Sequence, residues 1–266
     1  MTAVGSEQPR PRLAVYKFAS CDGCQLQLLN LEDELLVLAE RFDIVQFLEA
    51  SSRVVEGPCD VALVEGSIST PSDAERIQAV RQQAGQLVTI GACATAGGIQ
   101  HLRSRVDVED WKRAVYPHPE WIETLATSTA ISDHVHVDHE IQGCPVDKGE
   151  VLRVLLRGLL GTTPDPPRGS VCGECKRDGR VCVTVARGIP CLGPVTRAGC
   201  GALCPALGRG CYACFGPTED PNTASLSNRF AELGVPRRDV ARSFRGIQGQ
   251  RPAFQRAAEA LEDDDG

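Results

Sequence analysis

Short apolar runs alternate with helical patterns over the first 160 residues of the chain. The runs with β character are Leu13–Phe18, Asp43–Leu48, Asp60–Val64 and Gln86–Ile90. After the first run, leucines at positions 28, 31, 35 and 38 share one face of a predicted helix. After the third run, Thr70 is placed as the N-cap of a second helix, with Pro71 at its first position. This order of elements predicts an α/β fold with a parallel sheet.

The alternation continues to a last predicted strand, His134–Asp138, and to a buried helix, Val151–Leu160. Thr162–Gly169 is rich in proline and predicts a linker. We therefore expect two domains, residues 1–161 with the sheet and residues 170–266 beyond the linker. Apolar residues at helical spacing near the C-terminus, at positions 230, 233, 240 and 244, predict helices that support the part of the chain before them.

Eight of the 13 cysteines lie between Val171 and Pro217, among glycine, proline and arginine residues. They are Cys172, Cys175, Cys182, Cys191, Cys200, Cys204, Cys211 and Cys214. Large apolar residues are scarce in this segment, so burial of hydrocarbon surface cannot offset the entropy that the segment loses on folding. Disulfides, zinc ions or iron–sulfur clusters could hold it together instead.

The sequence does not favour these three possibilities equally. Disulfides persist in oxidising compartments, and the N-terminal sequence MTAVGSEQPRPR lacks the apolar core of a signal peptide, which argues against them. Zinc stays open, because two C-x2-C pairs and four further cysteines could form two sites of four thiolates each. The rest of the sequence has to decide between zinc and clusters.

Four cysteines outside this segment closely follow predicted strands. Cys21 and Cys24 come after the first strand, Cys93 after the fourth and Cys144 after the last. The carboxyl ends of parallel strands share one edge of the sheet, and ligands of open α/β sheets bind there. A lone cysteine is usually a small buried apolar residue. Four cysteines at one edge favour a cluster site.

The charge of the chain excludes some partners and fits others. The formal net charge is -7, which argues against a nucleic-acid surface. Arg153 and Arg157 interrupt the most apolar helix, so we expect no membrane insertion. Between Val171 and Pro217, six basic residues stand against two acidic ones, a net charge of +4. That excess would offset the charge of about -4 on two four-iron clusters with cysteine ligands.

Five motifs in colinear order resemble the small subunit of nickel–iron hydrogenases. They are CDGC at residues 21–24, VEGS at 64–67, GACATAGG at 91–98, GCP at 143–145 and CLGPVTRAGC at 191–200. The order of the eight later cysteines is most similar to the delta subunit of soluble NAD(P)-linked hydrogenases, also called sulfhydrogenases. Small subunits of methanogen hydrogenases are similar as well. The related subunit of respiratory complex I is more distant, because it uses adjacent cysteines and lacks the eight-cysteine extension.

This resemblance implies a flavodoxin-like parallel-sheet domain, followed by a small loop-rich iron–sulfur domain, with three 4Fe–4S clusters in all. The proximal cluster would be held by Cys21, Cys24, Cys93 and Cys144. The medial cluster would be held by Cys200, Cys204, Cys211 and Cys214. The distal cluster would be held by Cys172, Cys175, Cys182 and Cys191. The chain departs from many relatives at Asp22, where threonine is more usual, and at Cys172, where periplasmic relatives have histidine.

The resemblance also implies an electron-transfer subunit of a cytoplasmic enzyme that acts on dihydrogen. The nickel–iron centre would lie on a large subunit, and flavin and NAD(P) on diaphorase subunits. A methanogen-type subunit coupled to another acceptor is one alternative. The alternative from a different class is a zinc-stabilised interaction module, which would be colourless and hold about two zinc ions per chain.

Five residues outside the twelve cysteines need their own interpretation. Glu65 ends a predicted strand at the cluster edge, where a buried carboxylate either caps loop amides or relays protons. His134, His136 and His139 have no neighbouring cysteine, so surface histidines are favoured over a zinc site. Cys59 has no C-x2-C partner and is assigned to packing.

Overall fold

A computed structural model describes residues 9–159, 161–162 and 165–262 of the chain. Its centre is a five-stranded sheet in the order β2-β1-β3-β4-β5, with every neighbouring pair parallel. The strands are β1 (Arg12–Lys17), β2 (Asp43–Phe47), β3 (Cys59–Glu65), β4 (Ala84–Ile90) and β5 (His139–Ile141). This strand order is the flavodoxin-like one, so the predicted α/β class is confirmed.

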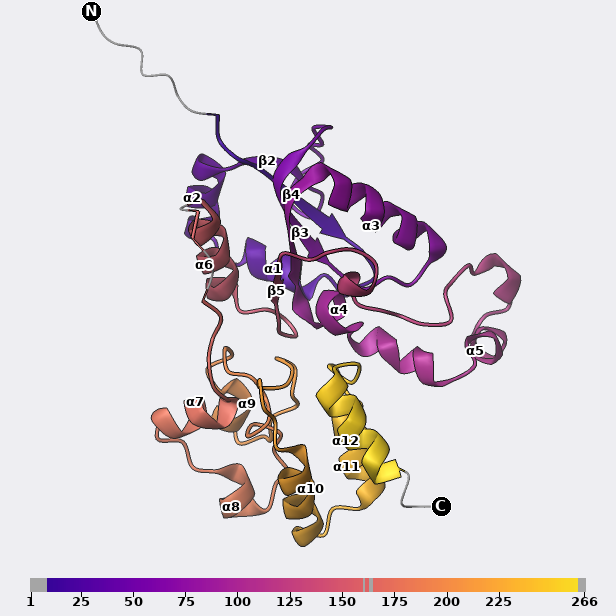
Figure 1. Cartoon of the computed structure of the whole chain (residues 1–266), viewed down its shortest axis with the longest axis vertical. Helices are drawn as coiled ribbons and strands as arrows, with labels where there is room; N and C mark the ends of the chain where they lie inside the picture. Colours follow the sequence, from indigo (N-terminus) through magenta and orange to yellow (C-terminus); the bar gives the residue numbers. More distant parts are fainter. Residues whose placement is uncertain (1–8, 160, 163–164, 263–266) are drawn as a thin grey trace, which may run out of the picture.

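Helices cover both faces of the sheet (Figure 1). One face carries α1 (Gly23–Leu29), α2 (Asp33–Arg41) and α6 (Lys148–Leu159), which pack on alternate strand residues such as Leu13, Val15 and Val88. The other face carries α3 (Pro71–Gln83), α4 (Gly91–Ala96) and the 3-10 turn η3 (Ile131–Asp133), which pack on the intervening residues, among them Ala14 and Leu87. A sheet buried on both faces explains the runs of consecutive apolar residues within β1, β3 and β4.

The predicted start of α3 is confirmed, whereas the predicted helix before it is divided in two. The Thr70 hydroxyl accepts a hydrogen bond from the Asp73 amide at 3.1 Å, and Pro71 opens the helix. The leucine stripe runs through α1 and α2, which are separated at Asn30–Glu32, where Glu32 has a φ of 54°. The break redirects the chain while Leu28, Leu31 and Leu38 all stay buried in the same apolar cluster.

The last strand lies later than the predicted His134–Asp138. The amides of His134 and Val135 bond to the carbonyl of Ile131 and so extend the turn η3. Val135 and Val137 pack into the apolar cluster on the α3 face, which accounts for their alternation without strand pairing. The Asp138 carboxylate accepts from the Leu87 amide at 2.7 Å, and pairing as β5 begins with the next residue.

The C-terminal part lies beyond the carboxyl edge of the sheet (Figure 1). It contains α7 (Val171–Arg177), α8 (Val183–Arg187), α9 (Leu203–Ala206), α10 (Thr223–Glu232), α11 (Arg237–Phe244) and α12 (Pro252–Glu262). The last three helices form an apolar cluster around Phe230, Phe244 and Phe254, which also packs against Leu192 and Val195 of the cysteine-rich segment. The expected supporting role of these helices is confirmed.

Some predicted features fall partly outside the described residues. These are most of the N-terminal sequence, Leu160 at the end of the helix before the linker, and residues 163 and 164 of the linker itself. Within the part of the chain that the structure describes, we find no helix with the length and apolarity needed to cross a bilayer.

Candidate metal centres

The carboxyl ends of four strands stand level with one another. Lys17 of β1 pairs in register with Glu65 of β3, which pairs with Ile90 of β4, which in turn pairs with Ile141 of β5. Cys21 follows β1 in a loop and Cys24 lies in the first turn of α1; Cys93 lies in the first turn of α4, directly after β4, and Cys144 lies in the loop after β5. The sheet therefore places the four cysteines at one edge, as predicted.

These four thiols are close enough to influence one another. Burial raises the pKa of the Cys93 thiol to about 11, with smaller contributions from Cys144 and Cys21. Burial also raises the pKa of Cys24, and Cys93 and Cys144 add to that rise. Thiols held in this way stay protonated unless positive charge is placed among them, and a metal centre supplies such charge. We call Cys21, Cys24, Cys93 and Cys144 the first group.

Two glycines make the close approach at the first group possible. A Cβ at Gly91, which has a φ of 88°, would collide with the Cys24 sulfur. A Cβ at Gly98, which has a φ of 61°, would lie 2.6 Å from the Cys93 sulfur. Both positions therefore need glycine for backbone conformation and for space. These requirements explain two of the three glycines of the GACATAGG motif.

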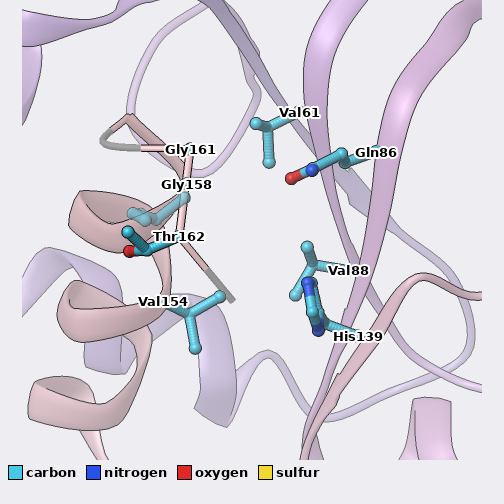
Figure 2. A pocket seen from close by; sticks show the side chains of 9 residues that line it. Val61, Gln86, Val88, His139, Val154, Gly158, Gly161 and Thr162 are labelled. Carbon is cyan, nitrogen blue, oxygen red and sulfur yellow. The ribbon is translucent and has the colours of Figure 1, made fainter. Parts of the chain in front are cut away.

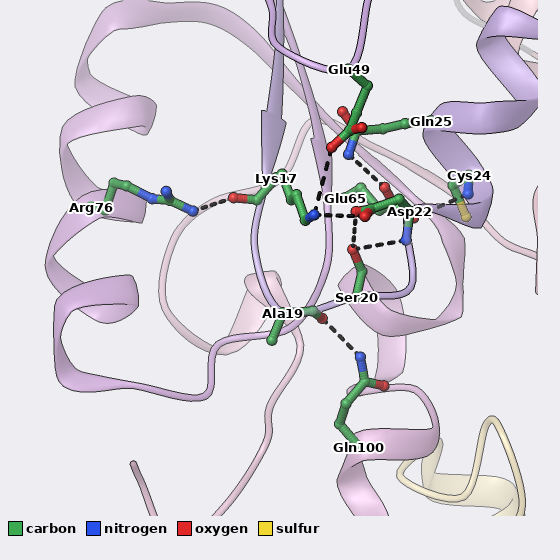
Figure 3. A network of polar contacts seen from close by, with 10 residues as sticks. All are labelled: Lys17, Ala19, Ser20, Asp22, Cys24, Gln25, Glu49, Glu65, Arg76 and Gln100. Atoms are coloured by element: carbon green, nitrogen blue, oxygen red, sulfur yellow. Dashed lines mark hydrogen bonds and ion pairs between the residues drawn. The ribbon is translucent and has the colours of Figure 1, made fainter. Parts of the chain in front are cut away.

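Glu65 holds the first turn of α1, which contains Cys24 (Figure 3). Its side chain is buried, Oε1 accepts from the Cys24 amide at 3.0 Å, and Oε2 accepts from the Gln25 side-chain amide at 2.8 Å. Burial raises the pKa of this carboxyl group, while the two hydrogen bonds lower it. The carboxylate thus satisfies one of the free amides at the start of α1, as the capping interpretation expects.

Two glutamines of this site were missed from the sequence. Gln25 is buried beside Glu65, and Gln100 lies between the Cys93 sulfur, at 3.4 Å, and the Ala19 carbonyl, to which it donates at 2.9 Å. Gln25 lies three residues before Leu28 on the apolar face of its helix, so a polar residue on that face was the available signal. Nothing in the sequence pattern marks Gln100.

The later cysteines gather in two further groups. Cys172, Cys175, Cys182 and Cys191 form the second group: partial burial raises the pKa of Cys175, and the other three members add to the rise. Cys200, Cys204, Cys211 and Cys214 form the third group. Burial raises the pKa of Cys211 to about 12, and Cys214 adds to that rise. Burial also raises the pKa of Cys214 to about 12, with contributions from Cys200 and Cys204.

All four cysteines of the third group line a single cavity. Its volume is about 270 Å³, and Cys144 of the first group also reaches it. Val171, Thr196 and Phe215 contribute much of the remaining wall. A cavity walled by four thiols and apolar side chains has the donor set and the space that an iron–sulfur cluster requires.

The three groups follow one another in space. Cys144 of the first group is a neighbour of Cys214 in the third: burial raises the pKa of Cys214, a hydrogen bond with the Cys144 backbone lowers it, and the charge of Cys144 raises it. The Cys211 amide of the third group donates to the Cys191 sulfur of the second at 3.2 Å. The spatial order is therefore first, third, second, and the second group includes the exposed Cys182.

Cys59 and the three histidines singled out in the sequence lie outside the three cysteine groups. Cys59 is buried at the start of β3, within the apolar cluster on the α3 face, which agrees with packing. His134 bonds to Thr129 at 2.8 Å and His136 is exposed. His139 lines a cavity of about 140 Å³ between α6 and the sheet, near the amino ends of β3 and β4 (Figure 2).

The described residues hold no set of three or more His, Cys, Asp and Glu side chains compact enough for a single metal ion.

Comparison with known proteins places this arrangement in a family. Residues 21–157 match a protein-family model described as NADH ubiquinone oxidoreductase, 20 Kd subunit. Sulfhydrogenase 2 subunit delta of Pyrococcus furiosus is 38% identical over 237 residues, which cover 88% of this chain and 98% of that protein. The chain belongs to the family of hydrogenase small subunits.

Other hydrogenase subunits are also similar to this chain. A subunit of the F420-non-reducing hydrogenase vhu of Methanococcus voltae is 31% identical over 256 residues, covering 84% of this chain and 88% of that protein. A chain in the crystal structure of an NAD+-reducing [NiFe]-hydrogenase in the H2-reduced state superposes with a TM-score of 0.56 and 29% identity. That match covers 59% of this hydrogenase small subunit and 96% of the solved chain. The predicted family is confirmed, and with it an oxidoreductase that acts on dihydrogen.

Proposed function

We propose that this chain is the electron-transfer subunit of a cytoplasmic nickel–iron hydrogenase and holds three 4Fe–4S clusters. The observation that carries the proposal is the order of the cysteine groups, from the sheet edge through the 270 Å³ cavity to the second group, which includes the exposed Cys182. When bound, the clusters would pass single electrons between a nickel–iron centre on the large subunit and an acceptor.

Each cysteine group would hold one cluster. The first group would hold the proximal cluster, the third group the medial one and the second group the distal one. Local backbone supports this assignment: the Ser170 hydroxyl accepts from the Gly173 amide at 3.2 Å and so fixes the start of α7, which carries Cys172 and Cys175. Glu174, between these two cysteines, accepts from the Gly199 amide at 2.8 Å and ties the second group to the third.

We propose a diaphorase with flavin and NAD(P) as the acceptor partner. One solved relative is named as an NAD+-reducing enzyme, and the relative from Pyrococcus furiosus is named as a sulfhydrogenase. A methanogen-type acceptor is the second candidate, because the relative from Methanococcus voltae is 31% identical over most of both chains. Purification of the assembly and analysis of its subunits separates the two, since only the first contains a flavin subunit that reduces NAD(P).

We also propose that residues 1–161 and 170–266 are separate domains. Each has its own apolar cluster, and the polar contacts that join them include Arg251 to Glu140 at 2.7 Å and Arg197 to Glu150 at 3.4 Å. For Glu65 we propose the capping role as the main one, because both of its carboxylate oxygens accept hydrogen bonds from α1, one from the Cys24 amide and one from the Gln25 side chain.

Quantitative iron and sulfide analysis tests the proposed function. Protein isolated without oxygen should be brown and contain about twelve iron and twelve acid-labile sulfide atoms per chain. A Cys204→Ser variant should lose part of that iron, whereas Cys59→Ser should retain all of it. A colourless protein with about two zinc ions per chain would refute the proposal in favour of a zinc-stabilised module.

A further inference from the structure

The segment of residues 107–123, which we call the arm, stands away from the rest of the molecule (Figure 1). It contains α5 (Val108–Val115) and the 3-10 turn η2 (Pro119–Trp121). Every residue of both elements is described, and none of them is buried. An isolated helix of this length is marginal in water, and helices in proteins are normally stabilised by packing of an apolar face.

The arm has such a face, but nothing in the described part of this chain covers it. Val108, Trp111 and Val115 share one side of α5, and the side chains of Trp111 and Val115 are 54% and 66% exposed. Tyr116 and Trp121 follow at 48% and 75% exposed, with the Trp121 ring stacked on His118. Exposed aromatic side chains gathered in this way are typical of protein interfaces.

The charged residues of α5 are paired within the helix. Lys112 lies 3.0 Å from Glu109, and Arg113 lies 3.2 Å from Asp110. The arm as a whole carries five acidic residues and two basic ones. A partner face that covers it would therefore be apolar at the centre and basic at the rim.

A run of exposed apolar residues leads along the chain from the cysteine edge of the sheet to the arm. Gly98 packs against Cys93, and the next residues form η1 (Ile99–Arg105). Ile99, Leu102 and Val106 are 54%, 40% and 39% exposed. The opposite side of η1 is held inward, where the Arg103 guanidinium donates to the carbonyls of residues 69 and 127 at 2.9 and 2.7 Å.

We propose that the arm is a docking element for the hydrogenase large subunit, and that Trp111 and Trp121 become buried when that subunit binds. Continuity of this apolar run along the chain with the first cysteine group selects this occupant. Cys21 and Cys144 are exposed at the same edge, and a centre held there exchanges electrons only with a partner that covers it. The inference rests on the proposed function.

The two tryptophans of the chain both lie in the arm, so they report on it alone. The chain is labelled with 5-fluorotryptophan, its two fluorine resonances are assigned with Trp111→Phe and Trp121→Phe, and unlabelled large subunit is added. We expect both resonances to shift and to lose their sensitivity to exchange of H2O for D2O. A complex whose two resonances remain solvent-sensitive overturns the inference but leaves the proposed function intact.

Two further results of the same titration are informative. Loss of solvent sensitivity at high concentration of the labelled chain alone would assign the arm to a second copy and overturn the inference. Failure to form any complex with the large subunit, by a chain with full iron content, would refute the proposed function as well.

A pair of variants supplies an independent test. The double variant Trp111→Ser, Trp121→Ser should bind the large subunit on the order of 100-fold more weakly, because interface aromatics dominate binding energy. The matched control is Val181→Ser, Val185→Ser, which removes two side chains of 74% and 80% exposure beside the second cysteine group. Equal affinities of the two variants, at equal iron content, would contradict the inference.

Discussion

At the scale of single residues, the cysteine edge depends on side chains that are not ligands themselves. Glu65 occupies the end of the central strand β3, and its two oxygens accept from Cys24 and Gln25. Gly91 leaves space for the Cys24 sulfur. The positions of the thiols are therefore set by neighbours as much as by the strands that precede them.

We expect Glu65→Gln to destabilise the protein by about 1–3 kcal/mol. An amide in this position has only one acceptor atom, so either the Cys24 amide or the Gln25 side chain loses its partner. The midpoint of urea unfolding, followed by circular dichroism, measures the effect. The double variant Glu65→Gln, Gln25→Glu restores a carboxylate that accepts from the new amide and should recover most of the loss. A double variant no more stable than the single one would contradict the capping role.

Gly91→Ala should prevent the first group from holding its proposed cluster, because the new methyl group takes the space of the Cys24 sulfur. Iron analysis should show a loss of about four of twelve atoms. Gly234→Ala is the control, since Gly234 has a φ of 76° with no atom near the missing Cβ. Both variants bear the strain of a left-handed alanine, about 1–2 kcal/mol, but only the first should lose iron. Equal iron contents would show that space at Gly91 is not limiting.

At the scale of elements, the sequence predicted what local pattern determines and missed what tertiary contacts determine. Four strands, the cap of α3 and the strand-end cysteines follow from apolar runs and turn residues. The break at Glu32 and the start of β5 at His139 depend on contacts with distant residues, such as that of Asp138 with Leu87. Gln100 was missed for the same reason, since its two partners come from separate loops.

One ion pair joins α6 to the CLGPVTRAGC motif. Arg197 lies 3.4 Å from Glu150, and both side chains are largely buried. Burial raises the pKa of Glu150, while Arg197 lowers it. Because Arg197 offsets the cost of burying this carboxylate, its removal leaves an acceptor without a partner.

We expect Arg197→Met to destabilise the protein by about 1–3 kcal/mol at pH 7, measured by urea unfolding. Without Arg197 the folded-state pKa of Glu150 moves further above its ordinary value of 4.5, so the loss should be smallest near that pH and grow as pH rises. Glu150→Met, Arg197→Met removes both charges and should be more stable than Arg197→Met alone. A loss that does not depend on pH would exclude this pair as its origin.

At the scale of the whole molecule, the two halves are stabilised differently. The sheet is packed between two apolar clusters, whereas the cysteine-rich segment has one small cluster of its own, Val171, Ala202 and Cys211, and adds Leu192, Val195 and Ala213 to the cluster of the C-terminal helices. The C-terminal helices have a core of their own around Phe230 and Phe254. We therefore expect the cysteine-rich segment between them to depend on bound metal for its fold.

Removal of iron with a chelator should then unfold one segment selectively. We expect amide hydrogen exchange in residues 170–217 to approach the rates of an unfolded chain, while β1, β3 and β4 stay protected. Mass spectrometry of peptides from the treated and untreated protein measures this. Equal loss of protection in both halves, or none in either, would contradict this difference in how the two halves are stabilised.

The spacing of the cysteines along the chain has a consequence for biogenesis. The first group draws its sulfurs from positions 21 to 144, and only a completed sheet brings them together. The second group spans positions 172 to 191 and the third spans 200 to 214, short stretches that a nascent polypeptide can close locally. We expect maturation to follow opposite orders in the two halves: the sheet forms before it receives inorganic iron and sulfide, and the later segment receives them before it forms.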